Sequence, residues 1–265
     1  MTPYEQTRAY WNHQNIDSVE TIDRVLYNFR ILFAYNSGKI ENEEINYHDT
    51  REIFENGKVL NYTGMPRTLF EQQNQRLCYE FLKNKIVSKE MISLEMVKET
   101  HSILTAGTYD EHRYIDRGER PGEFKKHDYI TGINEVGYAP EDVEDAIADL
   151  IGELNDVADS SDKIMAAAYF HASFENIHPF ADGNGRVGRT LMNYFLMTHG
   201  EPPLVVYDED KKRYYAALEQ YDTSEELQEL CEFLKYETAK TWEKTIERSQ
   251  GNYRKCNKKL EDVER

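Results

Sequence analysis

The chain has 265 residues, of which 39% are apolar and 31% charged, so it can bury one sizeable core beneath a strongly charged surface. Its 49 acidic residues outnumber the 32 lysines and arginines, and the formal net charge of -17 argues against nucleic acid and anionic membrane as partners, because both bind cationic surfaces. Three scattered cysteines without a CxxC pair, an N-terminus without an apolar signal core and the lack of a long apolar run together predict a cytoplasmic protein.

Most of the chain has the three- and four-residue apolar spacing of amphipathic helices. The first expected helix covers residues 18–35, where Ile22, Leu26, Phe29 and Phe33 fall on one face. Further helices are expected at residues 67–85, 90–105, 141–157, 162–177, 185–199, 209–221 and 224–248, followed by a charged tail.

One stretch, from Arg117 to Pro140, breaks this pattern. Glycines at positions 122, 132 and 137 surround short segments such as residues 128–131, and glycines that flank β-rich residues are typical of a hairpin. The sequence therefore predicts an all-α fold that carries one short β-hairpin at about residues 120–138.

The run His178–Arg189 (HPFADGNGRVGR) concentrates reactive side chains in twelve residues. Its Gly-Asn-Gly turn at 183–185 lies between two expected helices, and successive backbone N–H groups in such a turn can bind an anion. The next helix would add the positive end of its dipole. Arg186 and Arg189, three residues apart on that helix, suit two phosphates of one molecule.

Two further residues of this run point to chemistry. Asp182 can hold a Mg²⁺ ion through one carboxylate and leave the other positions to phosphate oxygens and water. His178 precedes Pro179, which biases it out of helical geometry and into the loop. A near-neutral imidazole beside a phosphate site can act as the general base for a hydroxyl nucleophile.

Three alternatives explain parts of this region. The spacing of Gly183, Gly185 and Gly188 resembles a dinucleotide fingerprint, with residues 204–208 as a later strand, but residues 177–182 lack the apolar strand that must precede it. A helical metal face and a plain turn are the other two. The metal face would use His171, Glu175 and His178, although Pro179 displaces His178 from the helix, and the plain turn would leave both arginines in solvent.

The run 178–189 resembles the Fic-domain signature His-Pro-Phe-x-(Asp/Glu)-Gly-Asn-Gly-Arg-x-x-Arg and agrees with it at every defined position. The likeness extends over about residues 95–235. It implies a helical Fic core with a β-hairpin flap. The chain would then divide into an N-terminal helical region at 1–94, the Fic core at 95–235 and a charged C-terminal helix or tail at 236–265.

The resemblance also implies an activity, the transfer of AMP from ATP to a Ser, Thr or Tyr hydroxyl of a target protein or of the chain itself. His178 would deprotonate the hydroxyl that attacks the α-phosphorus, Asp182 would anchor Mg²⁺, and Phe180 would pack into the core. The target segment would pair with the flap by strand addition. The phosphates would be held by Gly183, Asn184 and Gly185, with Arg186 at the γ-phosphate and Arg189 at the β-phosphate.

Tyr214 and Tyr215 resemble the tyrosines that relatives place on the nucleobase side. Asp222 stands where relatives often carry asparagine, which puts the adenine contact there in doubt. Ordinary helix packing is the alternative for all three residues.

A second motif, Ser37-Gly-Lys-Ile-Glu41-Asn42, resembles the inhibitory motif (Ser/Thr)-x-x-x-Glu-(Gly/Asn) of Fic proteins. Ser37 and Glu41 would share one side of a helical turn, and the structural alternative is a helix start capped by Ser37. The resemblance implies that Glu41 pairs with Arg186, takes the space of the γ-phosphate and misaligns ATP.

Three functions therefore stay open. The first is autoinhibited AMP transfer, in a chain that can form homo-oligomers as relatives often do. The second keeps the fold but transfers another phosphate-containing group, or also removes AMP. The third is a nucleotide-sensing module without turnover, which the presence of both His178 and Asp182 argues against.

Overall fold

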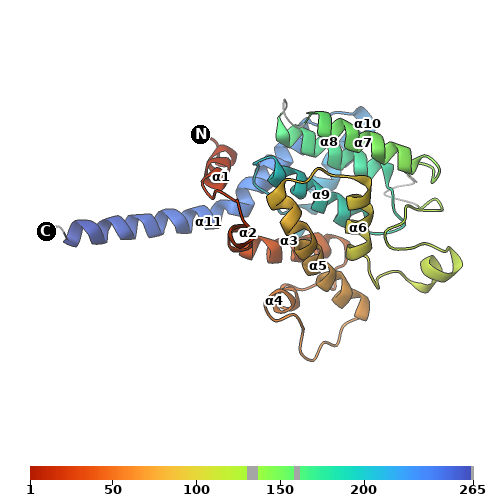
Figure 1. Ribbon diagram of the computed structural model, residues 1–265, viewed down its shortest axis with the longest axis horizontal. Helices are drawn as coiled ribbons and strands as arrows, with labels where there is room; N and C mark the ends of the chain where they lie inside the picture. The colour runs from red at the N-terminus through yellow and green to blue at the C-terminus, as the bar shows by residue number, and fades with distance from the viewer. Residues whose placement is uncertain (130–136, 158–161, 264–265) are drawn as a thin grey trace.

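The computed structural model describes residues 1–129, 137–157 and 162–263, and the elements among them are helical (Figure 1). Two single turns, η1 (His112–Asp116, π-helical) and η2 (Asp208–Asp210, 3-10), accompany the longer helices. The α-helices are α1 (Pro3–Asn12), α2 (Val19–Val25), α3 (Tyr27–Glu41), α4 (Tyr47–Asn56), α5 (Pro66–Ser88), α6 (Leu94–Leu104), α7 (Val143–Val157), α8 (Lys163–Ile177), α9 (Asn184–Thr198), α10 (Lys211–Ser224) and α11 (Gln228–Val263).

Apolar periodicity located most of these helices, with one error near the second motif. The helix expected at 18–35 is two helices that meet at Leu26, and the second continues to Glu41. Ser37 and Glu41 therefore belong to the end of α3, and Ser37 does not cap a helix start. Helices α1 and α4 had no separate prediction, although Thr2 and Asn46 cap their N-termini with their side chains.

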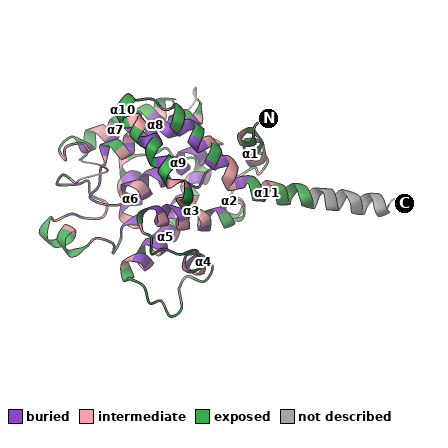
Figure 2. Cartoon of the chain, turned by 180° about the vertical axis from the view of Figure 1, so that it is seen from behind, coloured by how far each residue is buried: buried purple, intermediate pink, exposed green. Residues whose placement is uncertain are grey.

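Helix α9 lies at the centre of the molecule and is buried along most of its length (Figure 2). It packs against α8, α6, α3 and α5. A Cβ on Gly188 would come within 3.0 Å of Glu175 Oε1 on α8, so the glycine allows this close approach. Because a close-packed core resists displacement, the side chains of the first turns of α9 are held in fixed positions.

The apolar residues 204–206 are buried but do not form a strand. Asn193 on α9 bonds both backbone groups of Leu204, accepting from its N–H at 2.7 Å and donating to its carbonyl at 2.8 Å. The residues before Gly183 are helix α8 and a loop, with no strand. The dinucleotide-fingerprint alternative is therefore wrong.

The hairpin expected at about 120–138 has its centre, residues 130–136, outside the described residues. The described residues on either side, 117–129 and 137–140, contain no strand. The helical part of the fold prediction is thus confirmed, and the hairpin stays a prediction.

Helix α11 packs against α1, α8 and α10 and then projects away from the body of the molecule (Figure 1). The buried Trp242 fixes its first part, because the indole N–H donates to the Pro203 carbonyl at 2.7 Å. Within the described ranges, none of the helices combines the length and the hydropathy that crossing a bilayer requires.

Candidate active site

The loop that joins α8 to α9 is fixed by its own side chains. His178 ends α8 with φ 52°, and Gly183 precedes α9 with φ 85°. The side chain of Asn184 accepts the Phe180 N–H and donates to the Phe180 carbonyl, both at 2.8 Å. Phe180 is fully buried, as predicted. A non-glycine residue in the left-handed region costs about 1 kcal/mol, so this packing holds His178 in place.

His101 of α6 ties the loop to the start of the expected hairpin. Its buried ring stacks on Phe180 with 3.7 Å between the ring centroids. Nδ1 accepts the Gly122 N–H at 2.8 Å, which leaves the ring proton on Nε2, 3.0 Å from the Asp182 carbonyl oxygen. Burial lowers the pKa of His101 to about 3 and keeps the ring neutral.

Backbone hydrogen bonds hold both ends of the expected hairpin against the same loop. The Lys125 N–H donates to the Pro179 carbonyl at 2.9 Å, and the Tyr138 N–H donates to the Ile177 carbonyl at 3.0 Å. Gly137, with φ 67°, lies against the catalytic histidine candidate, since a Cβ there would be 2.7 Å from the Cβ of His178.

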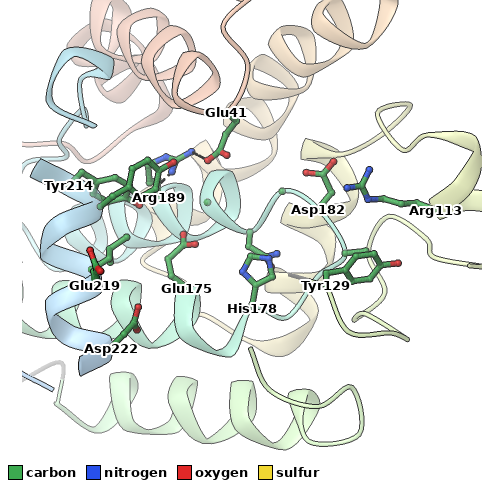
Figure 3. A pocket seen from close by; sticks show the side chains of 16 residues that line it. Glu41, Arg113, Tyr129, Glu175, His178, Asp182, Arg189, Tyr214, Glu219 and Asp222 are labelled. Carbon is green, nitrogen blue, oxygen red and sulfur yellow. Dashed lines mark hydrogen bonds and ion pairs between the residues drawn. The ribbon is translucent and has the colours of Figure 1, made fainter. Parts of the chain in front are cut away.

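A cavity of about 720 Å³ opens beside this loop. In Figure 3, Glu41 and Arg189 face it from one side, Asp182 and Arg113 from the other, and His178 lies between them. Of the predicted site residues, Arg186, Ser37 and Asn42 are not part of its lining. Those that line it are His178, Asp182, Gly183, Asn184, Gly185, Arg189, Tyr214, Tyr215 and Glu41.

A carboxylate of the chain itself covers the start of α9, where the sequence predicts an anion site. A Cβ on Gly185 would collide with Glu41 Oε1 and lie 2.8 Å from Arg189 Nη1, so the Glu41 carboxylate rests on the first turn of α9. Free N–H groups and the helix dipole favour an anion at that position. Glu41 therefore occupies the place that the sequence assigned to a phosphate.

Arg189 joins α9 to the end of α3. Its guanidinium is 1% exposed and donates to Glu41 Oε1 at 2.7 Å, to Ser37 Oγ at 3.1 Å and to the Ser37 carbonyl at 3.0 Å. The four-residue spacing of Ser37 and Glu41 thus places both on one arginine, as expected for one side of a helix. The arginine differs from the prediction, because Glu41 pairs with Arg189 and not with Arg186.

Arg186 points the other way and is 2% exposed. Its Nη2 is 3.4 Å from Asp182 Oδ1, and its Nη1 is 3.7 Å from Glu71 Oε1 on α5. Among the described residues its Nε has no hydrogen-bond partner. The two arginines of the signature therefore face different acids.

Asp182 is ionised and surrounded by positive charge. Burial alone would raise its pKa, but Arg186, Arg67 and Arg113 together lower it. No group of three or more His, Cys, Asp or Glu side chains in the described parts of the chain can hold a metal by itself. One cavity-facing carboxylate fits Mg²⁺ that arrives with nucleotide phosphates, because Mg²⁺ takes most of its remaining ligands from phosphate and water.

His178 is in the protonation state that a general base needs. Burial, followed by the charge of Lys125, lowers its pKa to about 4. At neutral pH the imidazole is therefore unprotonated and can accept a proton from a hydroxyl group in the cavity.

Tyr214 and Tyr215 of α10 differ in how far each is buried. Tyr214 is fully buried, and its hydroxyl lies 2.6 Å from His171 Nε2 and 3.5 Å from Arg189 Nη1. Tyr215 is 46% exposed and lines the cavity. Tyr214 therefore supports Arg189, while Tyr215 has a surface for a ligand. The alternative of a metal face through His171 is not supported, because that ring is bonded to Tyr214.

Sequence reasoning missed several residues of the site because they lie outside both motifs. Arg113 and Tyr129 line the cavity. Arg67 and Glu71 form an i, i+4 pair on α5, which the sequence alone presents as an ordinary surface pair. Glu119 is buried just before the expected hairpin and accepts from the hydroxyl of Tyr129, in the first part of that segment, at 3.0 Å. An acid beside Gly118 and close to Gly122 was the only signal that the sequence offered for Glu119.

Comparison with known proteins agrees with this geometry. Residues 91–196 match the model of the Fic/DOC family. The chain is 30% identical over 237 residues to protein adenylyltransferase fic-1 of Caenorhabditis briggsae, a match that covers 86% of this chain and 43% of that protein. It is 28% identical to protein adenylyltransferase fic-1 of Caenorhabditis elegans over 251 residues, covering 92% of this chain and 45% of the relative. The chain thus spans less than half the length of these relatives.

Two solved structures share the fold. A Fic domain-containing signaling protein from Bacteroides thetaiotaomicron superposes with a TM-score of 0.80 at 22% identity, covering 94% of this chain and 97% of the other. Fic-1 from Caenorhabditis elegans superposes with a TM-score of 0.78 at 24% identity, covering 94% of this chain and 71% of the other.

Proposed function

Because the chain contains a domain of the Fic/DOC family, we propose that it is a protein adenylyltransferase that moves AMP from ATP to a hydroxyl group of a protein. One observation carries this proposal. A neutral histidine and an anion site at the start of a buried helix open into the same cavity, beside an ionised aspartate. A hydroxyl nucleophile and a triphosphate could therefore meet there.

In the proposed reaction, His178 accepts the proton of the attacking hydroxyl. The hydroxyl oxygen forms a bond to the α-phosphorus as the bond to the β-phosphate oxygen breaks, and pyrophosphate leaves. The amides of residues 183–185 and the guanidinium of Arg189 hold the phosphates. Bound Mg²⁺, anchored by Asp182, would neutralise phosphate charge. Most of the rate enhancement would come from holding these catalytic groups in fixed positions, because core packing fixes the loop and α9.

The nucleobase would lie toward α10, where Tyr215 has an exposed ring beside the cavity. The target segment would enter beside residues 120–138, whose two ends are bonded to the loop. Hydroxyl groups of the chain itself can be targets as well.

We also propose that Glu41 inhibits this reaction. Its carboxylate rests on Gly185 and bonds Arg189, so a triphosphate must displace it from the phosphate site. ATP that leaves Glu41 in place would bind outside this phosphate site, with its α-phosphate away from His178.

The test is incubation with Mg²⁺ and ATP labelled in the α- or the γ-phosphate, with cell lysate as a source of targets. Wild type, Glu41→Gly and His178→Ala are compared. The proposal expects α-label on protein, more with Glu41→Gly and none with His178→Ala. Transfer of γ-label alone would identify a phosphotransferase. Bound ATP without transfer of either label would identify a sensing module.

A further inference from the structure

Both oxygens of the Asp182 carboxylate are already bonded to arginines. Arg67 on α5 donates from Nη2 to Oδ2 at 2.8 Å, and Arg186 Nη2 is 3.4 Å from Oδ1. Arg67 is outside the Fic signature and outside the segment that matches the Fic/DOC model, which begins at residue 91. Its side chain is 39% exposed, so no packing requirement explains where it points.

Arg67 is held in this position by the same part of the chain that carries the inhibitory motif. Its Nε donates to Glu71 Oε1 at 3.0 Å. The other oxygen of Glu71 accepts from Asn42 Nδ2 at 2.7 Å, and Asn42 follows Glu41 directly. The end of α3 therefore contacts the site twice, through Glu41 on Arg189 and through Asn42 and Glu71 on Arg67.

A metal ion on Asp182 and this position of Arg67 oppose each other. Mg²⁺ binds a carboxylate oxygen at about 2.1 Å. With Arg67 Nη2 at 2.8 Å from the same oxygen, the two cations would lie within about 5 Å of each other. A guanidinium has no lone pair to offer the metal, so its presence can only weaken metal binding.

We propose that Arg67 blocks the metal-binding carboxylate of Asp182, so that the N-terminal region inhibits the site at two points. The proposal rests on the proposed function, since it concerns the metal that accompanies ATP. Withdrawal of Arg67 from Asp182 becomes a condition for binding the metal with the nucleotide, separate from the displacement of Glu41.

The effect is measurable without turnover as a coupling between metal and nucleotide. The dissociation constant of the α,β-methylene analogue of ATP is measured by calorimetry in EDTA and in Mg²⁺. The constant in EDTA divided by the constant in Mg²⁺ gives the ratio by which the metal tightens binding. The measurement uses the Glu41→Gly chain, the same chain with Arg67→Gln, and the same chain with Arg113→Gln. Arg113 is a matched control, because it also lowers the pKa of Asp182 but no described hydrogen bond joins the two.

For a half-exposed ion pair we expect Arg67→Gln to raise the ratio about fivefold, and Arg113→Gln to raise it less than twofold. Arg67→Lys, which keeps the charge but loses the fork, should fall between Arg67→Gln and the parent. Melting temperatures show whether each variant is folded.

An unchanged or lower ratio with Arg67→Gln would overturn the proposal, since Arg67 would then bind phosphate or support Asp182. An equal rise with both variants would also overturn it, because general charge and not the contact would be responsible. If no variant binds the analogue with or without Mg²⁺, the proposed function itself is wrong.

Discussion

Replacement of Glu41 by glycine is the perturbation whose effect the structure defines best. The change removes the carboxylate that rests on Gly185, and the new glycine has no side chain to replace it. Arg189 is then free to bind a phosphate. Ser37 and the Tyr214 hydroxyl still contact the guanidinium, so Arg189 stays in position.

The magnitude follows from the exposure of the two partners. Arg189 is 1% exposed, but the Glu41 side chain is 37% exposed, so solvent screens part of the interaction. A charge-assisted hydrogen bond contributes about 1.5–3 kcal/mol when buried, and screening reduces this to about 1–2 kcal/mol. Removal of the competitor should therefore tighten ATP binding about fivefold to thirtyfold.

Calorimetric titration with the α,β-methylene analogue of ATP in Mg²⁺ measures this change. Glu43→Gly is the matched control, because the Glu43 side chain is 87% exposed and 3.7 Å from Lys211, away from the anion site. Loss of the Glu41–Arg189 contact in Glu41→Gly should also lower the free energy of unfolding by about 1 kcal/mol and the melting temperature by about 2–4 °C. Equal affinities in all three chains, or weaker binding by Glu41→Gly, would refute the competition between Glu41 and phosphate.

Three further predictions concern the loop and α10. Transfer rates should show no inflection near pH 6.5, because the pKa of His178 is about 4 and its imidazole stays neutral from pH 5.5 to pH 8; an inflection between pH 6 and pH 7 in single-turnover assays would contradict this. Tyr214→Phe should weaken analogue binding about threefold through Arg189 and lower the melting temperature, whereas Tyr215→Ala should weaken binding with little change in stability; calorimetry and thermal unfolding distinguish the two. Asn184→Ala removes both hydrogen bonds to Phe180 and should lower the free energy of unfolding by about 1–3 kcal/mol, which denaturant unfolding measures. A loss below about 0.5 kcal/mol, the scale of an ordinary surface substitution, would show that these bonds do not fix the loop.

The sequence located most of the helices because their apolar faces repeat with the helical period. It also located the candidate active-site loop, because Pro179 ends the preceding helix and Gly183 takes the left-handed conformation just before α9. Local spacing likewise placed Ser37 and Glu41 on one side of a helix.

The partners of these residues depend on packing between distant segments. Arg186 and Arg189 are equivalent in the signature, and only the position of α9 between α3 and α5 decides that Glu41 meets Arg189 while Glu71 meets Arg186. Tyr214 and Tyr215 are adjacent in sequence, yet the orientation of α10 buries one and exposes the other. No local pattern carries that information.

As a protein adenylyltransferase, the chain should split ATP at its α-phosphorus and leave AMP on protein. The most direct test measures pyrophosphate and protein-bound AMP in one reaction of the Glu41→Gly chain with ATP and Mg²⁺. We expect equal amounts of the two products, and neither product when the chain also carries His178→Ala. Formation of ADP with phosphate on protein, or pyrophosphate without protein-bound AMP, would contradict it.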